Sequence, residues 1–310
     1  MLKLYSPLFT QLSYPPPMLT SHNRYPYSPI VDRPDYSWPN GQRLAVYIAL
    51  NLEHFAFGVD LGAKLVPSTQ QPDVLNYAWR DYGNRVGVWR LLDLFEQLSL
   101  PAALLVNTSI YSYCPEVVTA FRDRGDEIVA HGYTNSERQD SMSPNAEAAM
   151  IATVTQAIAD HEGTPPAGWL GPWIAESWRT LDLLREAGYG YTLDWCCDDQ
   201  PIWLSTRAGP LLSIPYPQEL NDIPTIAVRN TSAADFADMI IDNVDEMLEQ
   251  SRTQPLVCGI ALHPYIVGQP FRLRHLRRAL QHIRERSDQI WLTHPGAIAR
   301  HIFSVCPSLK

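Results

Sequence analysis

The chain has 310 residues, of which 45% are hydrophobic and 18% are charged, and its formal net charge is -9. This composition excludes a disordered or low-complexity chain, and the acidic balance argues against a protein that binds the phosphate backbone of nucleic acids. No apolar run approaches the roughly 20 residues of a membrane-spanning helix, so we expect neither a nucleic acid nor a membrane as a partner.

Residues 1–40 contain clustered prolines and several aromatic residues, which exclude a central strand and predict an extended arm. We expect this arm to pack on its own domain or on a neighbouring subunit, which favours a homo-oligomer. The same stretch lacks the basic start and apolar run of a signal peptide. Together with five cysteines that form no Cys-x-x-Cys pair, this predicts a cytoplasmic protein with reduced thiols.

From residue 43 onward, apolar runs typical of buried strands alternate with segments whose apolar residues recur at helical spacing. The predicted strands are 43–50, 102–107, 127–131, 167–170, 189–193, 211–214, 256–262 and 290–292. The predicted helices are 82–98, 115–123, a helix beginning at 144, 177–187, 232–249, 272–284 and 296–303. This α/β alternation predicts parallel strands with helices outside them, and the number of units favours a single-domain barrel over an open sheet.

Polar side chains follow most of the predicted strands, at the end where a parallel barrel carries its active site. Glu53 and His54 follow the first strand, His131 follows the third, Asp194 the fifth, and His263 the strand at 256–262. Because these strand ends meet at one mouth of a barrel, we expect the five side chains to form a functional site.

The residue types at this mouth suit hydrolysis of a small-molecule substrate. Glu53 could take a proton from water, and a histidine could protonate a leaving nitrogen. The sequence contains no P-loop, no Gly-x-Gly-x-x-Gly and no Gly-x-Ser-x-Gly, which argues against a kinase, a dehydrogenase and a serine hydrolase.

The order of these motifs resembles the polysaccharide deacetylase (NodB-homology) superfamily over about residues 40–300. In that family a base Asp and a metal-binding Asp stand at the positions of Glu53 and His54, and a His-x-x-x-His motif stands at 131–135. Segment 170–172 resembles the Arg-x-Pro motif, and 262–264 resembles the Leu-x-His motif. The resemblance implies a distorted (β/α)7-type barrel over 41–310 with Glu53, His131 and His263 as catalytic residues.

Three positions depart from the family pattern. His54 replaces the metal-binding Asp, Asn135 replaces the second zinc histidine, and Leu170 replaces the arginine that orients the base. A neutral amide is a poor zinc ligand. The pattern is similar to the branch of PuuE-type allantoinases and cyclic-imide hydrolases, which implies hydrolysis of a C–N bond in a cyclic amide, ureide or imide. It also implies a homo-oligomer, a dimer or a tetramer.

The residues leave two models of the metal open. In one model, Zn²⁺ or another divalent metal is bound by His54, His131 and a carboxylate from Glu53, Glu137 or Asp194. In the other model, which we favour, no metal takes part and Glu53 activates water.

In the second model the substrate contacts come from polar residues and an aromatic wall. We expect His54, Asn135, Trp169, Asp194 and Asp199 to bind the substrate. Asp198 remains an alternative to the two aspartates, and Trp173 and Trp195 are alternatives as walls for a planar ring. Two other functions stay open: metal-dependent deacetylation of an N-acetylated sugar or glycan, and an inactive barrel that binds a metabolite or carbohydrate.

Overall fold

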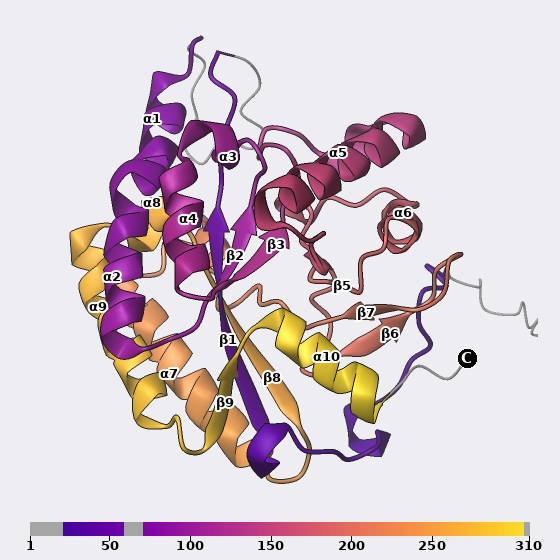
Figure 1. Cartoon of the computed structure of the whole chain (residues 1–310). Helices are drawn as coiled ribbons and strands as arrows, with labels where there is room; N and C mark the ends of the chain where they lie inside the picture. The colour runs from indigo at the N-terminus through magenta and orange to yellow at the C-terminus, as the bar shows by residue number, and fades with distance from the viewer. Residues whose placement is uncertain (1–20, 59–70, 307–310) are drawn as a thin grey trace, which may run out of the picture.

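The apolar runs form one strongly curled sheet with helices packed around its outside (Figure 1). The computed structural model describes residues 21–58 and 71–306. Within them the strand order is β6-β7-β5-β4-β3-β2-β1-β8, and β9 pairs with β1. The strands are β1 (Leu44–Leu52), β2 (Ala103–Val106), β3 (Glu127–Ala130), β4 (Gly168–Trp169), β5 (Tyr191–Thr192), β6 (Ile202–Leu204), β7 (Leu211–Ser213), β8 (Leu256–Leu262) and β9 (Ile290–Thr293).

The predicted distorted barrel is confirmed, with one exception to its parallel order. β6 was not predicted, and it pairs antiparallel with β7. The other pairings are parallel. A three-residue edge strand is too short to show a hydrophobic period in the sequence, which explains the omission.

The helices begin where the sequence offers caps. Ser143 accepts a hydrogen bond from the backbone of Ala146, and Ser232 does the same for Asp235, which satisfies orphan N–H groups in each first turn. The helices are α1 (Val74–Tyr82), α2 (Val88–Leu98), α3 (Ile110–Tyr113), α4 (Pro115–Asp123), α5 (Pro144–Glu162), α6 (Thr180–Glu186), α7 (Ala233–Gln250), α8 (Pro264–Val267), α9 (Pro270–Glu285) and α10 (Pro295–Val305). Among the described residues, none of these helices is both long and apolar enough to cross a membrane.

The predicted helix at 82–98 is longer than the sequence indicated. α1 precedes it from Val74, capped by the Asp73 side chain, and a π-helical turn at Gly83–Gly87 joins α1 to α2. α8 was also missed, because a four-residue helix opened by Pro264 shows no helical period.

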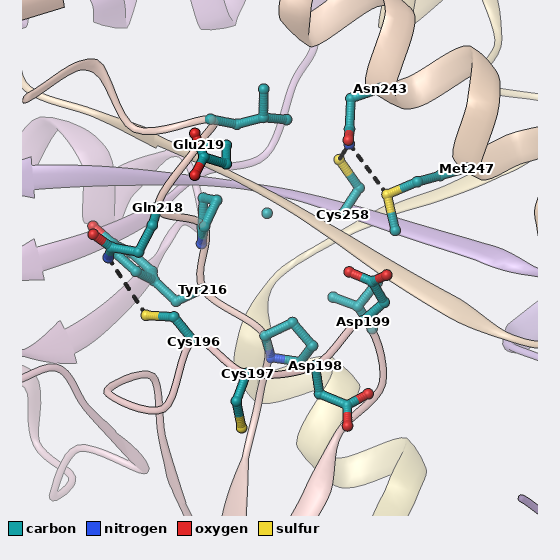
Figure 2. Close-up of a pocket in the computed structure, with 15 residues that line it drawn as sticks. Cys196, Cys197, Asp198, Asp199, Tyr216, Gln218, Glu219, Asn243, Met247 and Cys258 are labelled. Carbon is teal, nitrogen blue, oxygen red and sulfur yellow. Dashed lines mark hydrogen bonds between the residues drawn. The ribbon is translucent and has the colours of Figure 1, made fainter. Parts of the chain in front are cut away.

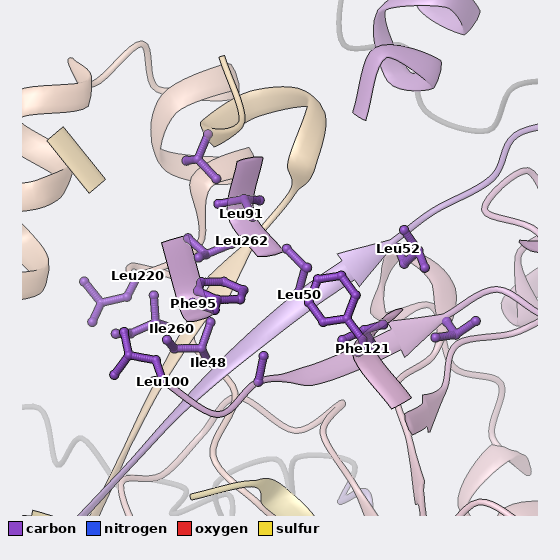
Figure 3. Close-up of a cluster of buried hydrophobic side chains, with 14 of the residues drawn as sticks. Ile48, Leu50, Leu52, Leu91, Phe95, Leu100, Phe121, Leu220, Ile260 and Leu262 are labelled. Atoms are coloured by element: carbon purple, nitrogen blue, oxygen red, sulfur yellow. The ribbon is translucent and has the colours of Figure 1, made fainter. Parts of the chain in front are cut away.

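Both faces of β1 are buried, as a near-continuous apolar strand requires. Ile48, Leu50 and Leu52 point outward and pack with Leu91 and Phe95 of α2 in the larger core (Figure 3). The residues that alternate with them, Ala45, Tyr47 and Ala49, point into the barrel and belong to a second hydrophobic cluster. This packing fixes the direction in which β1 carries the residues that follow it.

The free edge of β8 is closed by irregular chain instead of a further strand. The backbone N–H of Val257 donates to the Asp199 carbonyl, and that of Ala261 donates to the Leu220 carbonyl, each at 2.9 Å. A parallel bridge also pairs Asn221 with Ala261. The chain therefore lies along β8 at Asp199 and again at residues 220–221, where it ends at the same mouth as that strand.

The described part of the predicted N-terminal arm packs on its own chain. Arg33 forms a bidentate ion pair with Asp198, with both N–O distances at 2.6 Å. Trp38 is 1% exposed and donates to the carbonyl of Leu256 at 3.0 Å. Residues 1–20 lie outside the described residues, and the boundary at 40/41 stays a prediction.

Candidate active site

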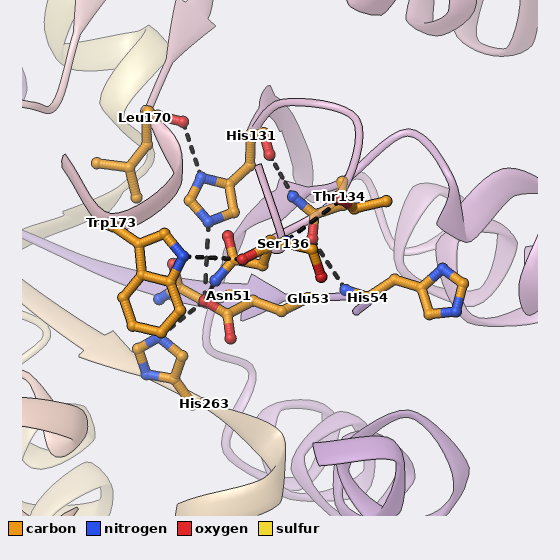
Figure 4. A network of polar contacts seen from close by, with 12 residues as sticks. Asn51, Glu53, His54, His131, Thr134, Ser136, Leu170, Trp173 and His263 are labelled. Carbon is orange, nitrogen blue, oxygen red and sulfur yellow. Dashed lines mark hydrogen bonds and ion pairs between the residues drawn. The ribbon is translucent and has the colours of Figure 1, made fainter. Parts of the chain in front are cut away.

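Three strand ends bring a carboxylate and two imidazoles together at one mouth of the barrel (Figure 4). Glu53 follows β1, His131 follows β3 and His263 follows β8, and these side chains are 6%, 2% and 3% exposed. The Glu53 Oε1 atom lies 3.8 Å from His131 Nε2 and 3.6 Å from His263 Nε2. The predicted convergence of these residues is therefore present in the fold.

Asn135 orients the Glu53 carboxylate. Its Nδ2 donates to Glu53 Oε1 at 2.7 Å. The loop that carries Asn135 is itself held by backbone contacts, since its N–H donates to the His54 carbonyl and its own carbonyl accepts from the Trp173 indole, both at 2.8 Å. Asn135 thus supplies the N–H that the family arginine would have supplied from position 170.

His263 is held by a carboxylate that the sequence did not reveal. Its Nδ1 lies 2.6 Å from Asp222 Oδ1, and its backbone N–H donates to Asp222 Oδ2 at 2.8 Å. Asp222 is fully buried. Because both bonds come from one residue, the imidazole is fixed in position and in rotation, with Nε2 toward Glu53.

His131 is fixed by carbonyl groups in the same manner. Its Nδ1 donates to the Leu170 carbonyl at 2.7 Å, since a carbonyl only accepts. Its own carbonyl accepts from Asn107, which also accepts the His54 backbone N–H at 2.9 Å. The Nε2 atom of His131 is consequently the one that faces Glu53.

The charges of this cluster stabilise one another. Burial acts to raise the pKa of Glu53, but the positive charge of His263 and the neighbouring His131 imidazole outweigh it and lower that pKa to about 2. Burial acts to lower the pKa of His263, but the negative charges of Asp222 and Glu53 raise it to about 9. At neutral pH the site therefore holds an ionised Glu53 beside a protonated His263.

Several polar atoms of the cluster are left open. Glu53 Oε2, His131 Nε2 and Asn135 Oδ1 are buried and have no hydrogen-bond partner within the described residues. Buried polar atoms without partners are rare in native proteins. Their concentration around one carboxylate indicates a space that receives water or substrate.

His54 does not join this cluster. Its ring stacks on Tyr113 with the centroids 4.3 Å apart, and its Nδ1 lies 3.0 Å from the Ser109 hydroxyl. Figure 4 shows it directed away from the Glu53 carboxylate, on the other side of the loop. His54 thus lies outside the ligand set that a metal model would need.

Asp194 lies on the neighbouring strand end and serves the loop that follows β4. It accepts the Gly171 backbone N–H at 2.7 Å, and burial raises its pKa. Burial and the negative charge of Asp194 raise the pKa of Glu176 well above its ordinary value. These two acids therefore support the segment whose Leu170 carbonyl holds His131.

The remaining predicted site residues lie elsewhere. Trp169 is fully buried in the larger core, where its ring meets the Tyr189 ring. Asp199 lines a separate cavity next to β8, together with Cys196 and Cys258 (Figure 2). Glu137 is partly buried, and its neighbour Arg138 pairs with Asp140.

The donor set does not fit the metal site of the family. Asn135 turns an N–H toward Glu53 where the second zinc histidine would supply a lone pair, and His54 is turned away. Within the described parts of the chain, no group of three or more His, Cys, Asp or Glu side chains has the arrangement of a metal site.

Sequence reasoning missed Asp222, and it named Trp173 only as one of several possible walls. Asp222 follows irregular chain, so no strand pattern pointed to it. Trp173 is one of three tryptophans that the sequence could not rank, and it adopts a left-handed backbone conformation with φ of 63°. That conformation is uncommon for a bulky residue, and it turns the indole toward the Asn135 loop.

Comparisons with known proteins agree with this fold. A family model described as polysaccharide deacetylase matches residues 76–192. The chain is 24% identical to the peptidoglycan deacetylase of Helicobacter pylori over 275 residues, covering 77% of this chain and 92% of that protein.

Two solved structures share the fold closely. The crystal structure of a probable polysaccharide deacetylase from Pseudomonas aeruginosa PAO1 has a TM-score of 0.79 and 27% identity, covering 92% of this chain and 100% of that chain. The crystal structure of PuuE allantoinase has a TM-score of 0.80 and 26% identity, covering 92% of this chain and 99% of that chain. Residues 76–192 of this chain therefore match the polysaccharide deacetylase family, whose members are hydrolases acting on C–N bonds other than peptide bonds, and the fold is shared with a probable polysaccharide deacetylase and with PuuE allantoinase.

Proposed function

We propose that the protein opens a small cyclic amide, ureide or imide by hydrolysing one of its C–N bonds. The observation that carries the proposal is the pair formed by Glu53 and His263, whose facing atoms lie 3.6 Å apart. The pKa of Glu53 is lowered to about 2 and that of His263 is raised to about 9. At neutral pH, Glu53 is therefore deprotonated and can act as the general base, while His263 is protonated and can act as the general acid. The likeness to PuuE allantoinase, whose name gives it a cyclic ureide as substrate, supports the proposal.

The proposed reaction begins at the open carboxylate oxygen. Glu53 Oε2 takes a proton from a water molecule as the water oxygen attacks the scissile carbonyl carbon, which forms a tetrahedral oxyanion. His263 Nε2 then donates its proton to the leaving nitrogen as the C–N bond breaks and the carbonyl reforms. The proton on Glu53 returns to His263, which restores both groups and leaves a ring-opened acid.

Asn135 and His131 hold the reactants in this scheme. Asn135 Nδ2 fixes the carboxylate, while its Oδ1 is free to accept the ring N–H of an imide or ureide. His131 presents Nε2 to the same space. A small planar ring with an N–H beside a carbonyl matches this pair of acceptors.

The first experiment assays the purified protein against succinimide, hydantoin, dihydrouracil and allantoin, with ring opening followed by chromatography. The matched variants are Glu53→Gln, which keeps the side-chain shape, and Glu137→Gln, which changes a partly buried acid two residues after Asn135. We expect Glu53→Gln to lose about 10²–10⁴-fold in kcat and Glu137→Gln to keep wild-type turnover. Normal turnover by Glu53→Gln would remove the base from the scheme.

A metal-dependent deacetylase of an N-acetylated sugar or glycan is the second candidate. It is favoured by the likeness to the Helicobacter pylori peptidoglycan deacetylase across 92% of that protein. Release of acetate from chitin oligosaccharides, without turnover of any cyclic compound, would replace the first proposal by this one. Binding of either class without turnover would favour a binding-only barrel.

Metal dependence is tested separately, by elemental mass spectrometry before and after dialysis against a chelator. We expect ring opening to continue at the same rate after chelation, because Asn135 and His54 do not offer the family ligands. Loss of turnover on chelation, with recovery on adding zinc, would contradict this expectation.

A further inference from the structure

Tyr265 is a buried phenol whose O–H has no acceptor in the part of the chain that the structure describes. It lies in the first turn of α8 and is 2% exposed, and the Arg80 guanidinium beside its oxygen can only donate. A buried O–H without an acceptor destabilises the folded protein, so its presence calls for a physical explanation. The other unpaired atoms of this kind around Glu53 belong to the candidate active site.

The phenol is tied to the same backbone as His263. Pro264 opens α8 directly after His263, and the two rings lie 5.9 Å apart between centroids at an angle of 66°. On its other side, the Trp79 ring meets Tyr265 edge-on at 6.1 Å. Tyr265 therefore forms the wall of the site beside the acid.

Tight backbone packing keeps Tyr265 in this position. A Cβ atom added at Gly83 would lie 2.8 Å from the Tyr265 backbone nitrogen, so the π-helical turn touches α8 without any intervening side chain. Such close contact is possible only with glycine. The phenol is consequently fixed before any substrate arrives.

The phenol stays protonated at working pH. Burial, together with the negative charges of Glu53 and Asp222, raises the pKa of Tyr265 well above its ordinary value, although the Arg80 guanidinium acts in the opposite direction. A neutral phenol can donate a hydrogen bond. Glu53 Oε2 and Asn135 Oδ1, which are also open, can only accept.

We propose that Tyr265 is a further catalytic residue, whose phenol O–H donates to the oxygen of the scissile carbonyl and stabilises the oxyanion of the tetrahedral intermediate. This inference rests on the hydrolysis proposed above. The oxyanion needs a donor, and the open oxygens beside the base, Glu53 Oε2 and Asn135 Oδ1, only accept. A donor that is fixed in a buried site stabilises developing charge without having to reorganise.

The test is Tyr265→Phe, with Tyr189→Phe as the matched control. Tyr189 is equally buried, but its hydroxyl is satisfied by Thr155 Oγ1 at 2.9 Å, in the core behind Trp169. For Tyr265→Phe we expect kcat to fall by about 10²–10³-fold, KM to change far less, and Tm to stay equal or rise. For Tyr189→Phe we expect a lower Tm and unchanged kcat.

A pH profile separates a direct role from an indirect one. Tyr265→Phe should keep the alkaline limb set by His263, because the phenol does not hold that imidazole. Wild-type kcat in Tyr265→Phe would overturn the inference. So would a fall in Tm as large as that of Tyr189→Phe, since it would mean that the fold already satisfies the hydroxyl.

The outcome for Tyr265 can be told apart from the outcome for the proposed function. If the protein releases acetate from chitin oligosaccharides and opens no ring, the cyclic-amide proposal fails. Tyr265→Phe measured on that substrate then decides this inference alone, because deacetylation also forms an oxyanion. If neither class of substrate is turned over, both proposals are overturned.

Discussion

At the scale of single residues, a neutral hydrogen-bond donor positions the Glu53 carboxylate in place of a charged one. Asn135 holds Glu53 Oε1 with a neutral N–H at 2.7 Å, in place of a guanidinium from position 170. The positive charge that keeps Glu53 ionised comes instead from His263, held by Asp222. The acid and the base therefore depend on each other, and a change in one alters the pKa of the other.

Asp222→Asn tests this dependence. The asparagine can still accept the Nδ1 proton, but the negative charge that raises the pKa of His263 is gone. We expect the alkaline limb of kcat/KM to move from about pH 9 to lower pH by at least about one unit, which is about a tenfold loss at pH 8 to 9.

Asp245→Asn is the control for that measurement. It removes a carboxylate from His282, an imidazole on the outer helices at 2.8 Å. The pH–rate profile of this variant should match the wild type. An alkaline limb that stays in place in Asp222→Asn would show that Asp222 does not set the acid.

The sequence placed Glu53, His131 and His263 at one mouth because each directly follows a buried strand, and parallel strands end at one face. Asp222 could not be found in this way. It reaches the mouth through ladder bonds between irregular chain and β8, which leave no apolar period. The direction of His54 was also beyond the sequence, since Tyr113 and Ser109, which hold it, come from another part of the chain.

At the scale of elements, the π-helical turn between α1 and α2 is shaped by its contact with α8. A Cβ added at Gly87 would lie 2.1 Å from the Pro264 carbonyl oxygen, and one at Gly268 would lie 2.2 Å from the same atom. The turn thus replaces side-chain packing with backbone contact. It sets the position of the residues that follow His263.

The direction in which Gly87→Ala changes the free energy of unfolding distinguishes this contact from local helix propensity. Inside a free helix, alanine would stabilise by about 0.5–1 kcal/mol over glycine. Here the added methyl meets backbone that has no room to move, so we expect the free energy of unfolding to fall by about 1–3 kcal/mol. Urea denaturation measures the change.

Gly190→Ala is the control, since its Cβ would first meet the Phe303 ring at 3.4 Å, an ordinary contact. This variant should unfold close to the wild type. A stabilised Gly87→Ala would mean that α8 does not press on the turn.

Element by element, the long strands and the capped helices could be predicted because their apolar period and their caps are local signals. The residues of β1 and of α7 are examples. The π-helical turn and α8 could not be predicted, because their shapes follow from tertiary contact between Gly87 and Pro264. β6 is too short to carry a period, and its antiparallel direction depends on the hairpin to β7.

At the scale of the whole molecule, several buried groups hold protons that the unfolded chain would release. Burial raises the pKa of Glu127 and Asp194, and the charge of Asp222 keeps His263 protonated to about pH 9. Between the ordinary pKa of each group and its raised value, the folded protein binds more protons than the unfolded chain. Stability therefore falls as the pH rises through this range.

We expect the free energy of unfolding to decrease from pH 6.5 to pH 9, and His263 alone accounts for about 3 kcal/mol of this loss. Glu53 acts in the opposite direction, but only below its ordinary pKa, where its charge is lost toward pH 2. Urea titrations at a series of pH values give the slope. His263→Gln should flatten it, and an equal slope in that variant would assign the effect to other groups.

The closing segment of the barrel has a consequence for engineering. Since residues 220–221 pair with β8 and are followed directly by Asp222, any insertion between residues 215 and 222 would shift the carboxylate out of reach of its imidazole. The exposed turn at 207–208, between β6 and β7, lies outside that pairing and tolerates a graft better. A designer who wishes to add a recognition loop to this scaffold should therefore lengthen the β6–β7 hairpin and keep residues 215–222 at their native length.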